Sequence, residues 1–182
     1  MSPEVFYHGG MDMDIAPATD GQLLDRLTAL GIAHCTYDHP AVFTVEESRI
    51  HCAHIPGTHT KNLFLEDRRG GLWLVVAREH VRIDLKQLAK GLGLARFSFG
   101  APEVLLQALG VPPGSVTPFS LINDAGARVH VVLDAGMMDG EILNFHPLRN
   151  DRTTSVSPAG LLRFLRDTGH QPMIIALPER AP

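Results

Sequence analysis

The pattern of apolar residues along the chain predicts five helices, four of which open at a capping residue or a first-turn proline. The first has Thr19 or Asp20 at its cap, apolar residues three to four positions apart, and Gly31 at its end. The last has Ser157 as its cap and Pro158 in its first turn. The expected helices cover residues 20–30, 44–51, 85–92, 102–109 and 158–168.

Short apolar runs between polar or glycine-containing turns predict the β-strands. Two of these runs, 60–65 and 72–77, flank a polar turn with two glycines, which is typical of a hairpin. The expected strands cover residues 33–38, 60–65, 72–77, 96–98, 119–122, 129–133, 142–145 and 173–177. Hairpins with interspersed helices favour an α/β domain of the α+β type, in which a mixed, mostly antiparallel sheet has helices packed around it.

The length and composition indicate one globular domain. The 182 residues are 45% hydrophobic and 20% charged, so the chain can bury a sizeable core. Residues 1–18 show no stable period and are expected to form a loosely ordered arm before a domain at 19–182. Two cysteines without a CxxC spacing, no secretory leader and no long apolar run predict a cytoplasmic protein without a membrane segment.

The net charge of −4 is the wrong sign for a general nucleic-acid binder, because affinity for nucleic acids depends on cations that neutralise phosphates. The charge is unevenly distributed, since residues 61–96 contain eight basic and four acidic residues. This stretch is either a solvated surface or a local contact for one end of a tRNA. Lys86 and Lys90, on the outer face of the expected helix 85–92, are the candidates for that contact.

Three short stretches at the borders of expected strands are more polar than their surroundings: 60–62, 114–118 and 144–147. Lys61 is either a surface lysine or a partly desolvated cation. The Gly-x-x-x-Pro sequence at 114–118, read as a turn entering a strand, is either an ordinary loop or a nest of backbone N–H groups. His146 is one histidine among ten, and alone it indicates little.

Other catalytic arrangements have little support in the sequence. His51, His54 and His59 lie close together, but there is no HExxH motif and no paired cysteines, which favours surface histidines over a metal site. No GxSxG motif marks a nucleophilic serine, and no GxGxxG or GxxxxGK motif marks a nucleotide site. We therefore expect neither a metal nor a cofactor.

Taken together and in order, the polar stretches resemble the YbaK/ProX family, the prolyl-tRNA synthetase editing-domain superfamily. The resemblance covers about residues 19–177 and rests on several separate motifs. These are HPAVFTVEE at 39–47, KNLFL at 61–65, GxxxP at 114–118, NFHP at 144–147, Asn150 and Thr153-Thr154. The free-standing ProX proteins are the most similar branch, and the resemblance implies the YbaK fold with a curved sheet.

The resemblance also implies a function, a site and partners. The function is trans-editing hydrolysis of the ester of mischarged Ala-tRNA(Pro), with prolyl-tRNA synthetase as a further partner. The implied catalytic residues are Lys61, Asn62 and His146. The implied substrate-binding residues are Gly114, Ser115, Val116, Thr117, Pro118, Phe43, Thr44 and Val45. A fixed ammonium and backbone N–H groups would stabilise the negative charge that develops on the ester carbonyl, without a covalent nucleophile.

Three alternatives remain open at this point. A sister enzyme could act on Cys-tRNA(Pro) or another aminoacyl-tRNA with the same catalytic residues and a different pocket. A non-catalytic nucleic-acid-binding module could keep the fold without hydrolysis. A plain structural domain is disfavoured, because it would not explain why all three polar stretches occur together.

Overall fold

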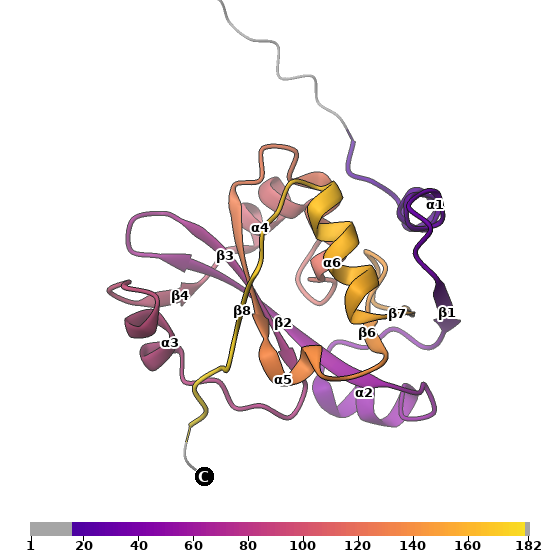
Figure 1. Cartoon of the computed structure of the whole chain (residues 1–182), viewed down its shortest axis with the longest axis horizontal. Helices are drawn as coiled ribbons and strands as arrows, with labels where there is room; N and C mark the ends of the chain where they lie inside the picture. The colour runs from indigo at the N-terminus through magenta and orange to yellow at the C-terminus, as the bar shows by residue number, and fades with distance from the viewer. Residues whose placement is uncertain (1–15, 181–182) are drawn as a thin grey trace, which may run out of the picture.

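The computed structural model describes residues 16–180, in which a mixed eight-stranded sheet is flanked by helices (Figure 1). The strands are β1 (His34–Asp38), β2 (Thr58–Asp67), β3 (Leu72–Arg78), β4 (Phe97–Phe99), β5 (Val129–Asp134), β6 (Leu143–Phe145), β7 (Arg152–Val156) and β8 (Met173–Ile175). The helices are α1 (Asp20–Ala29), α2 (Val45–His51), α3 (Leu85–Gly91), α4 (Pro102–Leu109), the 3-10 helix η1 (Pro118–Asn123), α5 (Ala135–Met138) and α6 (Pro158–Asp167). The first fifteen residues of the expected N-terminal arm lie outside the described part.

The order of strands in the sheet is β1-β7-β6-β2-β3-β5-β8, and β4 pairs with β2 off this path. Four of the seven pairings are antiparallel and three are parallel. The predicted mixed and mostly antiparallel sheet is confirmed, as is the hairpin of β2 and β3. None of the helices in residues 16–180 is long and apolar enough to cross a lipid bilayer.

Capping explains where the longer helices begin. Thr19 and Gln22 form a reciprocal capping box at the start of α1, and Gly31 takes a left-handed conformation just after its end. Ser157 accepts a hydrogen bond from the Gly160 amide at the start of α6, where Pro158 occupies the first turn. These ends agree with the sequence-based predictions.

The sheet has an apolar cluster on each face, and strand β2 contributes to both. Phe64 belongs to the cluster that includes residues of α1, α4 and α6, whereas Leu65 belongs to the cluster with Trp73 and Leu88. Successive side chains of a strand point to opposite faces. Asn62 therefore shares the face of Phe64, and Lys61 shares the face of Leu65.

Three details differ from the prediction. Residues 119–122 were expected to form a strand but belong to η1, because Thr117 caps the turn and Pro118 supplies a helical first residue. The 114–118 turn therefore enters a 3-10 helix and not a strand. Strand β7, which contains arginine, threonine, serine and valine, and the one-turn helix α5 were not predicted.

A candidate active site at a split in the sheet

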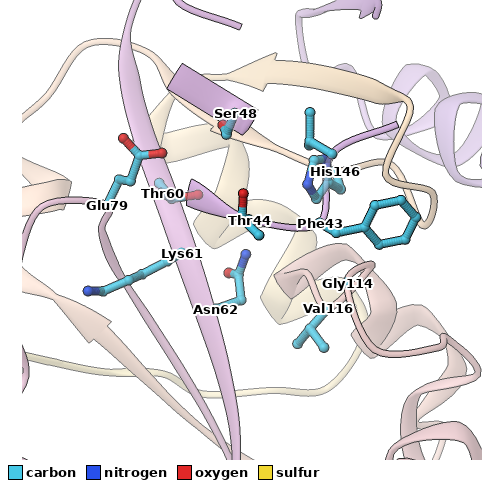
Figure 2. A pocket seen from close by; sticks show the side chains of 11 residues that line it. Phe43, Thr44, Ser48, Thr60, Lys61, Asn62, Glu79, Gly114, Val116 and His146 are labelled. Carbon is cyan, nitrogen blue, oxygen red and sulfur yellow. The ribbon is translucent and has the colours of Figure 1, made fainter. Parts of the chain in front are cut away.

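A cavity of about 190 Å³ opens beside β2, at the place where this strand lacks a partner on one side (Figure 2). Strand β6 pairs with β2 only at Thr58 and His59, and β4 pairs with it from Leu65 onward. Between these points, no strand among the described residues pairs with that edge of β2. The cavity is lined by Val42, Phe43, Thr44, Ser48, Thr60, Lys61, Asn62, Glu79, Gly114, Val116 and His146.

The wall before α2 is held by a network of local hydrogen bonds. Thr44 caps α2 by accepting from the Glu47 amide at 3.1 Å, and the Glu47 carboxylate accepts from the Phe43 amide at 2.6 Å. Val42 exchanges two hydrogen bonds with Asn150, each at 3.0 Å. The polar motif residue Asn150 thus fixes the segment that carries Phe43 and Thr44.

The side chain of Asn62 faces the cavity and is unusual in its hydrogen bonding. Its Oδ1 atom is buried and accepts no hydrogen bond, and no other buried side-chain nitrogen or oxygen within residues 16–180 lacks a partner. An unpaired buried polar atom costs about 1–3 kcal/mol of stability. Its neighbour Thr60, by contrast, donates to the carbonyl of Asn144 at 2.7 Å. The polar side chain of Asn62 therefore does not stabilise the fold through its oxygen, unlike that of its neighbour Thr60.

Lys61 lies at the side of the cavity, with its ammonium turned away from Asn62 (Figure 2). The ammonium donates to the carbonyl oxygen of Val81. Burial lowers the pKa of Lys61, and the negative charge of Glu79 opposes this shift. The Glu79 carboxylate also accepts from Arg49 at 3.4 Å. The negative charge of Glu79 therefore acts on two cations, the Lys61 ammonium and the Arg49 guanidinium.

His146 follows β6 directly and reaches the cavity from the opposite side. Its Nδ1 lies 3.0 Å from the carbonyl oxygen of Arg152 and donates to it, because a carbonyl can only accept. In the neutral ring, Nε2 is therefore an acceptor without a hydrogen. Burial lowers the pKa of His146, with a further lowering from the charge of His39, while the Arg152 carbonyl acts in the other direction. The imidazole is thus kept neutral to a lower pH than usual.

The 114–118 turn contributes fewer residues than predicted. Gly114, with a φ of 90°, and Val116 line the cavity. Ser115, Thr117 and Pro118 are buried and do not line it. The Ser115 amide already donates to the Pro112 carbonyl at 3.1 Å, so at most part of the turn is available as a nest of N–H donors.

Most, but not all, of the predicted site residues meet at this cavity. Lys61, Asn62, His146, Phe43 and Thr44 line it, together with the two turn residues. The side chain of Val45 is not among those that the structure describes. Lys86 and Lys90 are exposed on α3, outside the lining.

Four lining residues were not predicted as site residues: Val42, Ser48, Thr60 and Glu79. The hairpin register could have identified Glu79, since Lys61 pairs with Ala77 and Glu79, two residues further on, is then its diagonal neighbour on the same face. Ser48 could have been found from its place one turn after the Thr44 cap.

Comparisons with known proteins show the family to which this chain belongs. Residues 39–164 match the family model of the aminoacyl-tRNA editing domain. The chain therefore belongs to the aminoacyl-tRNA editing domain family, also called the YbaK/ProX family, which includes aminoacyl-tRNA deacylases.

Individual relatives agree with this assignment. "Prolyl-tRNA synthetase associated domain-containing protein 1" of Bos taurus is 41% identical over 158 residues, which cover 84% of this chain and 92% of the relative. "Prolyl-tRNA editing protein ProX" of Acetoanaerobium sticklandii is 33% identical over 162 residues, or 88% of this chain and 96% of that protein. A crystal structure of a candidate trans-editing enzyme for prolyl tRNA synthetase has a TM-score of 0.68 at 19% identity, over 90% of this chain and 99% of that chain, which shows the shared fold.

Proposed function

We propose that this protein hydrolyses the ester bond of mischarged tRNA in trans, with Ala-tRNA(Pro) as its substrate. The observation that carries the proposal is a single cavity lined by the ammonium-bearing Lys61 and the free amide of Asn62, both from β2, and by the imidazole acceptor of His146 from the end of β6. The name of the ProX relative supports the editing of prolyl-tRNA. The names of the relatives also make prolyl-tRNA synthetase a partner to test. We place the reaction in the cytoplasm.

The proposed chemistry follows from which groups can accept a proton and which can stabilise a negative charge. Water adds to the ester carbonyl, the bond to the ribose 3′ oxygen breaks, and alanine and tRNA are released. The Nε2 acceptor of His146 suits the removal of a proton from that water and its transfer to the ribose 3′ oxygen as the ester bond breaks. Lys61 and Asn62 stabilise the carbonyl oxygen as it becomes negative, and for this the Lys61 ammonium exchanges the Val81 carbonyl for the substrate oxygen.

The size of the cavity favours a small aminoacyl group. A cavity of about 150 Å³ holds one benzene molecule, so the 190 Å³ here fits an alanyl group and part of the ribose. A second cavity of about 30 Å³ shares Ser48, Thr60, Asn62 and His146, and it has room for about two water molecules. Because one methylene is worth only about 1–3 kcal/mol, the tRNA itself must supply part of the selectivity.

The test is a deacylation assay with Ala-, Ser-, Cys- and Pro-tRNA(Pro), run on the wild type and on Lys61→Ala. We expect the alanyl ester to be hydrolysed fastest and Lys61→Ala to be slower by roughly 100- to 1000-fold, as for the loss of one oxyanion donor. Arg163→Ala, which removes an exposed cation of α6 outside the cavity lining, is the matched control and should behave as wild type.

Each outcome separates one alternative. Preference for the cysteinyl ester would make the protein a sister enzyme with another substrate. Binding of every tRNA without turnover would support a non-catalytic module. Near wild-type turnover by folded Lys61→Ala would remove this lysine from the chemistry.

A further inference from the structure

One aromatic side chain at the cavity is largely exposed to solvent. Phe43 is 71% exposed, whereas the preceding Val42 is only 3% exposed. Figure 2 shows its ring at the rim of the cavity beside Gly114, directed away from Lys61 and Asn62. A Cβ atom on Gly114 would lie 3.4 Å from Cδ1 of this ring, so the ring rests against the glycine.

The exposure of Phe43 does not come from a loose segment. The Glu47 carboxylate accepts from its amide at 2.6 Å, and Asn150 holds Val42 through two hydrogen bonds. The backbone of Phe43 is thus held from both sides, while its ring remains in water. A single exposed apolar side chain is common on protein surfaces. What points to a ligand contact here is that the ring is carried on a held backbone at the mouth of the cavity.

The size of the cavity leaves the rest of the substrate outside it. The 190 Å³ volume is filled by the aminoacyl group and part of the ribose, as argued above. The adenine base that carries this ribose must then lie outside the cavity. Every tRNA ends in adenosine at the esterified position, so the same base is presented whatever the amino acid.

We infer that the Phe43 ring is the stacking platform for the terminal adenine of the charged tRNA, with Gly114 leaving room for the ribose beside it. Unpaired bases at RNA ends are recognised by stacking on aromatic side chains. This inference rests on the proposed function and adds to it a residue that binds the base and does not take part in the chemistry.

The test removes the ring and the base separately. Alanyl-RNA minihelices with the acceptor stem of tRNA(Pro) are made with a normal 3′ adenosine or with an abasic 3′ ribose. The ratio kcat/KM is measured for wild type, Phe43→Ala and Phe43→Trp. Phe99→Ala is the matched control, because Phe99 is 67% exposed on β4 and does not line the cavity.

We expect Phe43→Ala to lower kcat/KM on the normal substrate by roughly 5- to 150-fold, the range for one base stacked on one aromatic ring. Loss of the base should lower the wild-type value by a similar factor and leave Phe43→Ala almost unchanged. Phe43→Trp should keep the dependence on the base, and Phe99→Ala should match wild type on both substrates.

Two results would overturn the inference. If Phe43→Ala equals wild type on both substrates, the ring does not contact the RNA and is free for a protein partner. If it slows both substrates by the same factor, the ring shapes the cavity and does not bind the base. Absence of wild-type turnover would refute the proposed function instead, and Kd values for the two uncharged minihelices would then decide the stacking alone.

Discussion

Replacing Asn62 with leucine separates what this residue does for the fold from what it does for the reaction. Its buried Oδ1 lacks a hydrogen-bond partner, and leucine has a similar shape without the unpaired oxygen. Since such an oxygen costs about 1–3 kcal/mol, we expect Asn62→Leu to raise the free energy of unfolding by roughly 1 kcal/mol. For a domain of this size this is a rise in Tm of about 2–4 °C. Deacylation should fall by about 100-fold, because an oxyanion donor is lost.

Asn144→Leu is the matched control for this prediction. Asn144 lies in the neighbouring strand β6, and both ends of its amide are hydrogen-bonded: the oxygen accepts from Ser155 at 2.5 Å and the nitrogen donates to the Pro56 carbonyl at 3.1 Å. The same substitution there leaves two partners unsatisfied and should lower stability by about 1–3 kcal/mol. Urea unfolding followed by circular dichroism measures both changes. Equal destabilisation by the two substitutions would show that the Asn62 amide supports the fold, and our reasoning would be wrong.

The remaining predictions concern pH, salt and the turn. Because burial lowers the pKa of Lys61, its ammonium should lose its proton at a pH below 10.5, and the deacylation rate should fall as the pH rises past that point. A Lys61→Arg variant that remains active should show this fall in rate at a higher pH. Because burial lowers the pKa of His146, the fall of kcat/KM at low pH should occur below pH 6.5. The variant His146→Gln should lose this pH dependence. An unchanged pH dependence in that variant would exclude the imidazole as the base. The double variant Lys86→Gln/Lys90→Gln should reduce the slope of log affinity for tRNA against log salt concentration by about two, while the control Arg163→Gln should not change this slope. Equal slopes for the double variant and the wild type would place α3 outside the interface. Gly114→Ala should cost about 1–2 kcal/mol of stability and also lower activity, whereas Gly70→Ala, with a similar φ of 81° at the hairpin turn, should have the same strain and full activity. Full activity in both glycine variants would show that the turn tolerates a side chain beside Phe43.

Local signals in the sequence predicted most of the fold. Caps and glycines fixed the ends of α1, α4 and α6, and the two glycines after Asp67 fixed the hairpin of β2 and β3. Strand β7 was missed because it is polar in composition: its two threonines and its serine become buried only through pairing with β1 and β6. Residues 119–122 were misassigned because an apolar run has the same appearance in a buried strand and in a buried 3-10 helix.

The candidate site was predictable as a set of segments but not as an arrangement of atoms. Lys61 and Asn62 are adjacent in a strand, so their side chains must point to opposite faces of the sheet. Both line one cavity only because β2 has an unpaired edge between its contacts with β6 and β4, which lets both faces reach the same opening. That edge depends on where two distant strands end, and no local pattern encodes it. The direction of the Lys61 ammonium follows in the same way from the hairpin register, which brings Glu79 and Val81 to one side of it. An essential role for Lys61 therefore requires its side chain to leave the Val81 carbonyl when substrate binds, and the comparison of Lys61→Arg with Lys61→Ala tests whether a cation is needed at this position.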